Sequence, residues 1–343
     1  MSAVAVGSAC APAARRLLGI GVLGCADIAV RRFLPAVIQS DRARLVAIAS
    51  RDCRKASVVA HRYACATSDY RGLLHDEQVD LIYLPLPNHL HEEWVIKAAD
   101  HGKHVLCEKP LGLSLDSVNR MVDAASRNGV LLYEDLMYLQ HPQHGRIKEM
   151  LAAGRIGTVT GLHCVFTFPG PPPGTFRLDP HRGGGAFHDL NRYPLSAARF
   201  FLRGDVSDII RCDAIRQDEL IISMDSEART TADERFTFSI AFGQPYHCFY
   251  EISGTRGTLR LDRAFTPPAD HQCRLEIRGS GGDETMLLPA HDHFRLTIDH
   301  VAALIARGTG FSPEHERWRS LAGAADRFLQ HARVQEVSSC SQT

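Results

Sequence analysis

The first third of the chain alternates short apolar runs with stretches in which apolar residues recur every three to four positions. Short apolar runs predict buried strands, and the longer period predicts amphipathic helices. Their alternation predicts a parallel sheet covered by helices on both faces, so we expect a doubly wound α/β domain of the Rossmann type over residues 16–136. The expected strands are 17–23, 44–49, 79–84, 105–107 and 130–133, and the expected helices are 28–38, 53–63, 91–101 and 115–127.

Beyond Leu136 the runs become longer, alternate apolar with polar residues, and are separated by Gly and Pro turns. This pattern predicts an α+β domain over residues 137–335, with an open, mostly antiparallel sheet and helices on one face. Residues 1–15 and 336–343 are expected to be flexible ends. The expected strands are 159–168, 236–242, 247–252, 258–261 and 274–277, and the expected helices are 189–202, 293–306 and 317–329.

Composition narrows the possible partners and the compartment. The 343 residues suit two domains, and 39 basic against 39 acidic residues leave no bulk charge to attract nucleic acid or anionic lipid. The central uncharged stretch 156–176 holds four prolines, which argues against a membrane-spanning helix. The apolar N-terminus has its basic pair, Arg15-Arg16, behind it rather than in front, so we expect no secretory signal and a cytoplasmic protein.

The spacing of the cysteines and histidines does not indicate a metal site. The ten cysteines include no Cys-x-x-Cys pair, which excludes a zinc ribbon and fits reduced thiols in the cytoplasm. His89-x-His91 and His291-Asp292-His293 each lack a third ligand at a suitable spacing. We therefore expect no metal, and we interpret Asp292 as the cap of the helix that follows it.

A phosphate-binding turn is expected directly after the first strand. A literal Gly-x-Gly-x-x-Gly occurs at Gly19, Gly21 and Gly24, but its first two glycines fall inside the expected strand, whereas the phosphate turn must follow it. The turn is better placed at 24–29, where the helix N-terminus can hold an anion. The cofactor residues expected there are Gly24, Cys25, Ala26, Asp27 and Ile28.

The end of the second strand bears on the choice of dinucleotide. NAD-binding domains usually carry Asp or Glu there for the ribose hydroxyls. This chain has Ser50-Arg51 instead, and a hydroxyl beside a guanidinium suits a 2'-phosphate. We therefore expect NADP(H), with Ser50 and Arg51 in its site.

A Glu-Lys-Pro tripeptide at 108–110 ends the fourth expected strand, at the edge where open doubly wound sheets bind ligands. The chain has only five lysines against 34 arginines, and a lysine, unlike an arginine, can exchange a proton with a substrate. Lys109 is thus a candidate catalytic residue. The alternative is a solvated surface lysine.

Residues 102–110 resemble the Gly-Lys-His-Val-x-x-Glu-Lys-Pro motif of the glucose-fructose oxidoreductase, inositol dehydrogenase and rhizopine-catabolism (Gfo/Idh/MocA) family. Residues 86–91 resemble the Thr-Pro-Asn-x-x-His segment of the same family, and 183–193 resembles its Gly-Gly-Gly-x-x-x-Asp-x-Gly-x-His element. The resemblance covers about 17–329. It implies a cofactor site that includes Leu86, Pro87, Asn88, His91, Glu108, Lys109, Arg177 and Asp189.

Two positions depart from the family pattern. Asn191 replaces the usual Gly, and Tyr193 replaces the His of the dehydrogenases. An unperturbed tyrosine has a pKa near 10 and is suited to giving a proton, so the change favours carbonyl reduction. We expect Asp189 and Tyr193 to face the same cleft from one helix, with Lys109 and Tyr193 both at the reacting oxygen and either one as the proton donor. The alternative is a structural tyrosine.

Within the family, the chain looks most like the sugar 3-ketoreductases that act on TDP-linked deoxysugars in antibiotic biosynthesis. This likeness implies hydride transfer from NADPH to the C-3 ketone of a TDP-linked 3,4-diketo-2,6-dideoxyhexose, by a homodimer or homotetramer built through the exposed sheet of the second domain. The matching segments are 24–29, 84–87, 141–144, 265–268 and 288–292.

A nucleotide-linked substrate needs cations for its diphosphate. Candidates are Arg31 and Arg32 on the first helix, Arg177 after the Pro-rich loop, and Arg263 before the 265–268 segment, since a bidentate arginine supplies both charge and geometry. Two alternatives stay open. The chain can be a family member that oxidises a free polyol, an inositol or a dihydrodiol, or a non-catalytic NADP-binding sensor.

Overall fold

Two sheets organise residues 16–308 and 310–338, the part of the chain that the computed structural model describes. The first is a six-stranded sheet with strand order β3-β2-β1-β4-β5-β6, and every neighbouring pair is parallel. The order reverses beside β1, which confirms the doubly wound domain. Its strands are β1 (Leu18–Leu23), β2 (Ala43–Ala49), β3 (Ala66–Ser68), β4 (Leu81–Leu84), β5 (His104–Glu108) and β6 (Leu132–Asp135).

The helices of this domain follow the predicted order. The helix predicted over 115–127 is found with those bounds, because the Ser114 side chain caps it by accepting from the Ser117 amide. β3 and α3 were not predicted, since three-residue strands and six-residue helices carry too few positions to show a period. The helices are α2 (Cys53–Arg62), α3 (Tyr70–His75), η2 (Asn88–Leu90), α4 (His91–Asp100) and α5 (Leu115–Arg127).

The helix after β1 contains a π-helical turn. η1 (Ala29–Phe33) runs directly into α1 (Leu34–Ile38), and the Leu34 amide donates to the Ala29 carbonyl five residues back. Pro35 has no amide to continue the regular ladder. Such turns recur at functional sites, and this one carries Arg31 and Arg32.

The second sheet has nine strands in the order β14-β13-β12-β11-β7-β10-β9-β8-β15. Only the pairs β10–β7 and β15–β8 are parallel among these described strands, so the sheet is mostly antiparallel, as predicted. The strands are β7 (Val159–Phe168), β8 (Val206–Gln217), β9 (Leu220–Thr230), β10 (Arg235–Phe242), β11 (His247–Gly254), β12 (Gly257–Asp262), β13 (Cys273–Gly279), β14 (Glu284–Leu288) and β15 (Arg333–Glu336).

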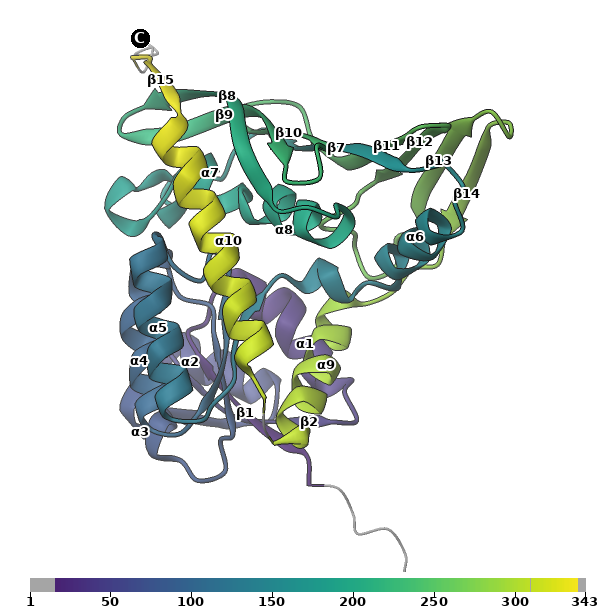
Figure 1. The fold of residues 1–343 in the computed structure, drawn as a ribbon. Helices are drawn as coiled ribbons and strands as arrows, with labels where there is room; N and C mark the ends of the chain where they lie inside the picture. Colours follow the sequence, from purple (N-terminus) through teal and green to yellow (C-terminus); the bar gives the residue numbers. More distant parts are fainter. Residues whose placement is uncertain (1–15, 309, 339–343) are drawn as a thin grey trace, which may run out of the picture.

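Helices separate this sheet from the first domain (Figure 1). One helix was expected over 189–202, but the structure has two, because Pro194 cannot donate to the carbonyl four residues back. Asn191 between them has ordinary helical angles, so the position requires no glycine. The remaining elements are η3 (Met137–Gln140), α6 (Pro142–Ala152), η4 (Phe176–Leu178), η5 (Pro180–Arg182), α7 (Ala186–Leu190) and α8 (Arg192–Phe201).

The two C-terminal helices return to the first domain. We expected α9 (His293–Arg307) to cover the second sheet, and this was wrong: α9 packs against α1 and β2, because its buried face meets the apolar residues of the first domain. α10 (Ser312–His331) crosses both domains and contacts α5, α8 and β8 (Figure 1). The Trp318 indole N–H donates to the Leu132 carbonyl, which fixes α10 against β6.

The C-terminal end of the second domain also differs from expectation. The tail was expected from residue 336, but Glu336 closes β15 and the Val337 amide donates to the Arg216 carbonyl. Residues 1–15 lie outside the described part. In the described ranges, none of the helices has the length and apolar character that a membrane span requires.

Candidate active site

A cleft of about 790 Å³ opens at the carboxyl ends of β1, β4 and β5, where the second domain faces the first sheet. Residues of both domains line it, in agreement with the rule for ligand sites in doubly wound sheets. The predicted site residues that line the cleft are Ala26, Asp27, Ile28, Arg31, Arg32, Leu86, Asn88, Glu108, Lys109, Arg177, Asp189 and Tyr193. The predicted site residues outside its lining are Gly24, Cys25, Ser50, Arg51, Pro87, His91 and Arg263.

Lys109 reaches from the end of β5 to α7 of the second domain. Its Nζ donates to the carbonyl and to Oδ1 of Asp189, both at 2.7 Å. The Lys109 and Asp189 side chains are only 9% and 12% exposed, so Lys109 is not a solvated surface lysine. Arg177 adds a second cation, with Nε 3.1 Å from the same Asp189 oxygen. Burial opposes ionisation of Asp189, but Lys109 and Arg177 together hold its pKa below the ordinary value.

Tyr193 lies beside this ion pair, with the Lys109 ammonium 5.3 Å from its ring centre. The ring packs against Phe166 and Phe265 at 5.0 and 5.3 Å between centres. Burial, with a smaller contribution from the Asp189 charge, raises the Tyr193 pKa well above its ordinary value, so the hydroxyl stays protonated. No hydrogen bond joins this hydroxyl to another described residue, so the Tyr193 O–H, on the cleft wall, is available to a ligand.

The glycine run 183–185 brings Arg177 to Asp189. The Gly185 amide donates to the Arg177 carbonyl at 2.9 Å. A side chain at Gly184 would place its Cβ 2.6 Å from that same carbonyl oxygen, so only glycine permits the approach. The run thus sets the Arg177 backbone against the start of α7, which carries Asp189.

Asn88 and His91 tie the loop after β4 to its surroundings. The side-chain amide of Asn88 donates to the Gly183 carbonyl of the second domain at 2.8 Å. His91 was expected to contact the cofactor, but it is fully buried, and its ring nitrogens lie 2.9 and 2.8 Å from the carbonyls of Pro110 and Leu86. His91 therefore joins the loop after β4 to the loop after β5, and its position makes it a positioning residue rather than a contact residue.

Glu108 accepts a hydrogen bond from Tyr83, whose hydroxyl donates to the Glu108 carboxylate at 2.7 Å. Its register partner on β6, Asp135, is fully buried, and neither carboxylate oxygen has a partner among the described residues. Burial, together with the Glu108 charge, raises the Asp135 pKa well above the ordinary value. The sequence analysis did not identify Asp135, although its place at the end of a strand beside Glu108 was a usable signal.

The turn that the sequence predicts to bind phosphate directly follows β1. Gly19 and Gly21 lie inside β1, and Gly24 follows its last residue. Gly24 has φ of +125°, and a Cβ there would lie 2.9 Å from a Leu86 side-chain carbon, so both conformation and space require glycine. The helix begins at Asp27, three residues later, so the backbone amides of its first turn, which have no partner within the helix, start where Ala26 and Asp27 line the cleft.

Ser50 and Arg51 lie outside the cleft lining, directly after the last residue of β2. The Ser50 hydroxyl accepts from the Asp52 amide and lies beside the Cys25 thiol, which connects it to the phosphate turn. Lys55 acts electrostatically on the same thiol. Neither Arg51 nor Lys55 forms an ion pair within the described residues. Lys55 was missed, although it lies four residues after Arg51 and is one of only five lysines.

The predicted diphosphate arginines differ in their surroundings. Arg31 pairs with Asp27 one helical turn before it. Arg263 does not line the cleft, because its guanidinium stacks 4.4 Å from the centre of the Tyr246 ring. Arg32 lines the cleft and has no ion pair within the described residues. The expectation that Arg263 faces the substrate is thus not supported by its position.

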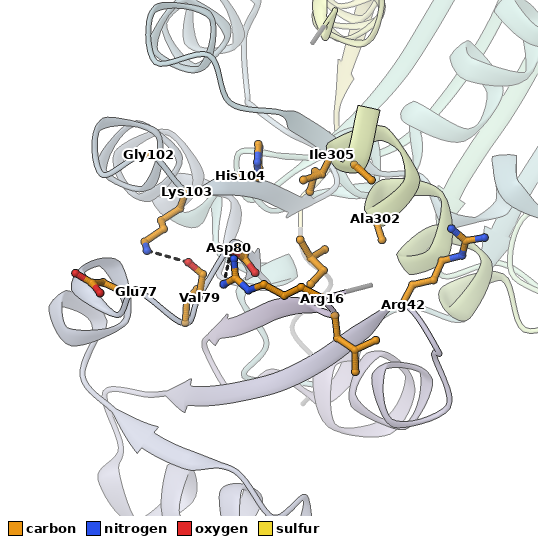
Figure 2. Close-up of a pocket in the computed structure, with 13 residues that line it drawn as sticks. Arg16, Arg42, Glu77, Val79, Asp80, Gly102, Lys103, His104, Ala302 and Ile305 are labelled. Carbon is orange, nitrogen blue, oxygen red and sulfur yellow. Dashed lines mark hydrogen bonds and ion pairs between the residues drawn. The ribbon is translucent and has the colours of Figure 1, made fainter. Parts of the chain in front are cut away.

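A second cavity, of about 390 Å³, lies at the opposite end of the first sheet (Figure 2). Its lining includes the residues before β1, β4 and β5, together with α9. Its charged groups are largely used internally: Lys103 donates to the carbonyls of Asp76 and Val79, and Asp80 accepts from Arg16 and the Gly19 amide. Because ligands bind at the other edge of such sheets, we assign the cavity no catalytic role.

In the described ranges, no three His, Cys, Asp or Glu side chains are grouped so that they could hold a metal ion.

Comparison with known proteins finds a matching family model for each of the two domains. A family model described as the oxidoreductase family with an NAD-binding Rossmann fold matches residues 18–136, and the GFO/IDH/MocA C-terminal domain matches residues 144–283. A dTDP-3,4-didehydro-2,6-dideoxy-alpha-D-glucose 3-reductase from Saccharopolyspora spinosa is 37% identical over 302 residues, covering 86% of this chain and 90% of the relative. The enzyme of that name from Actinomadura kijaniata is 37% identical over 312 residues, which cover 89% of this chain and 91% of the relative.

Solved structures also resemble this chain over most of its length. The 3-ketoreductase KijD10 from Actinomadura kijaniata, in complex with NADP and TDP-benzene, has a TM-score of 0.90 and 33% identity, covering 94% of this chain and all of that one. An aldose-aldose oxidoreductase from Caulobacter crescentus has a TM-score of 0.84 at 20% identity, which shows a shared fold.

We predict that Arg51→Ala weakens NADPH binding much more than NADH binding, because the lost charge-assisted hydrogen bond to a 2'-phosphate contributes about 1.5–3 kcal/mol. Fluorescence titration of the free enzyme with each dinucleotide measures both constants. Arg44→Ala, which removes a half-buried arginine near the start of β2, is the control. Equal weakening of both dinucleotides by Arg51→Ala would contradict the assignment.

Proposed function

This chain belongs to the Gfo/Idh/MocA family of oxidoreductases, and from that premise we propose that it is an NADPH-dependent sugar 3-ketoreductase. Its substrate is a TDP-linked 3,4-diketo-2,6-dideoxyhexose, reduced at C-3 in the biosynthesis of a deoxysugar of an antibiotic. The relatives with more than a third of their residues identical carry this activity in their names, and the KijD10 complex holds NADP and a TDP derivative.

One observation carries the proposal. Lys109 and Tyr193 line the cleft from opposite sides of the boundary between the domains, and the Lys109 ammonium lies 5.3 Å from the centre of the Tyr193 ring. Two hydrogen-bond donors on neighbouring side chains of one cleft suit a carbonyl oxygen that gains negative charge as it is reduced. A non-catalytic sensor would not require this arrangement.

The residues near β1 and β2 fit the proposed cofactor. The turn at Gly24 leaves the backbone amides of the following helix free for a diphosphate, and Ser50, Arg51 and Lys55 supply a hydroxyl and two cations for a 2'-phosphate. NADPH, when bound, supplies the hydride. Glu108, on the floor of the cleft and hydrogen-bonded by Tyr83, is suited to a ribose hydroxyl.

The roles of the two donors follow from their surroundings. We assign the proton to Lys109: as hydride reaches C-3 and the oxygen becomes an alkoxide, an N–H bond of the ammonium breaks and an O–H bond forms. Burial raises the Tyr193 pKa well above its ordinary value, so Tyr193 keeps its proton and orients the ketone by a hydrogen bond. Asp189 fixes the ammonium through two contacts of 2.7 Å.

We also propose that the chain assembles as a homodimer or homotetramer through the uncovered face of the second sheet, in the cytoplasm. That face carries side chains of alternating sign, such as Arg235 beside Glu227 and Arg278 beside Glu276. A second copy related by twofold symmetry could match them. Six of the eight cysteines among the described residues are buried, and all eight are free, which suits a reducing compartment.

For the donors, we predict that Lys109→Ala lowers turnover by at least about 100-fold, since general acid catalysis contributes about 10²–10⁴-fold. Tyr193→Phe removes one neutral hydrogen bond and lowers turnover by about two- to tenfold. Steady-state rates of ketone reduction with saturating NADPH measure both effects. Lys97→Ala, an exposed lysine paired with Glu93, is the control. Turnover within about twofold of wild type in both active-site variants would place the site elsewhere.

For the substrate, we predict a much higher kcat/KM for the TDP-linked 3-keto sugar than for the same sugar without its nucleotide. Contacts to the remote nucleotide supply binding energy that the free sugar forgoes. NADPH consumption with each substrate, and NADP reduction with free polyols and inositols, gives the comparison. Equal efficiency on linked and free sugars would assign the protein to the polyol dehydrogenases.

A further inference from the structure

Two segments far apart in the sequence line one part of the cleft, and a third segment packs behind both. Six residues form what we call the distal wall: Thr266, Pro267, Ala269, Asp292, His293 and Phe294. Behind it, the Gln143 side chain donates to the Ala264 carbonyl, and the His141 ring lies 6.2 Å from the His293 ring. The 141–144 segment thus supports both parts of the distal wall from behind, and the reduction itself uses none of these residues.

His293 lies on this wall and has an unpaired polar atom beneath its surface. The residue lines the cleft but is only 4% exposed, and its buried Nδ1 has no hydrogen-bond partner among the described residues. The neighbouring Asp292 carboxylate is occupied, because it caps α9 by accepting from the Phe294 and Arg295 amides. A buried ring nitrogen without a partner is costly, so a ligand that supplies one gains affinity.

Arg32 faces the same place from the π-helical turn. Among the four arginines considered for a diphosphate, Arg31 pairs with Asp27, Arg177 pairs with Asp189, and Arg263 stacks on Tyr246. Arg32 lines the cleft without an ion pair in the described residues, and its charge acts on His293. Burial, His141 and Arg32 together lower the His293 pKa to about 3, so its imidazole is neutral beside a cation that has no counter-ion.

We propose that Arg32 and His293 form the subsite for a phosphate of the nucleotide half of the substrate. This inference rests on the proposed function and names the place where its nucleotide binds. Arg32 supplies the positive charge, and the imidazole of His293 supplies an N–H donor. The distal wall then recognises the nucleotide while Lys109 and Tyr193 act on the sugar, which gives the two ends of one substrate separate sites in a single cleft.

The test is calorimetric titration of the NADPH-saturated enzyme with thymidine diphosphate, the probe for this subsite. We expect Arg32→Gln to weaken its binding by about tenfold or more, as expected for the loss of a charge-assisted contact. We expect His293→Leu, which keeps the apolar volume, to weaken it by about threefold or more. Arg32→Lys, which retains the charge, should recover part of the loss. Thymidine without phosphate should bind wild type and Arg32→Gln alike.

Arg42→Gln is the matched control, because Arg42 is an exposed arginine at the second cavity, outside the cleft (Figure 2). Melting temperatures show that each variant is folded, and Arg32, being exposed, can be replaced without disturbing the core. If wild type binds thymidine diphosphate and Arg32→Gln and His293→Leu bind it within about twofold of wild type, the subsite is overturned while the proposed function stands. If wild type does not bind it, both are overturned.

Discussion

The buried ion pair between Lys109 and Asp189 is the constraint on which the site depends. Breaking a buried pair by removing one partner is strongly destabilising, because the remaining charge stays out of water. The two side chains come from different domains and are almost fully enclosed, so the pair fixes the end of β5 against α7. Arg177 adds a second cation to the same carboxylate and is held there by the glycine run that precedes α7.

Other polar contacts across the domain boundary surround this pair. Asn88 donates to the Gly183 carbonyl, and Arg192, buried on α8, donates to Glu134 on β6 and to the Gly112 carbonyl. His91 joins the loops that carry Asn88 and Lys109 within the first domain. Together these contacts set the position of Tyr193 relative to Lys109, so a reacting oxygen can meet both donors only while the two domains keep this arrangement. The cleft is therefore a product of the interface rather than of either domain.

Residues with a local signal could be predicted from the sequence. Lys109 and Tyr193 lie in motifs, and the turn at Gly24 follows a strand with a clear apolar run, so their roles need no knowledge of distant contacts. Other features depend on the tertiary structure. The apolar face of α9 does not reveal which sheet it covers, the guanidinium of Arg263 stacks on a ring 17 residues earlier in the chain, and His91 is buried by two loops that meet only in the fold. Asp135 and His293 stand out because they have buried side-chain polar atoms without hydrogen-bond partners among the described residues. This burial depends on tertiary packing, which the sequence pattern does not show.

The central claim is that Asp189 acts by holding the Lys109 ammonium in place. It is tested most directly by single-turnover hydride transfer from pre-bound NADPH to the TDP-linked ketone in Asp189→Asn, with the NADPH dissociation constant measured on the same preparation. The account predicts transfer slowed by about 100-fold or more, on the scale of a lost general acid, with NADPH affinity changed by less than about threefold. A transfer rate within about twofold of wild type, or a loss confined to NADPH affinity, would contradict it.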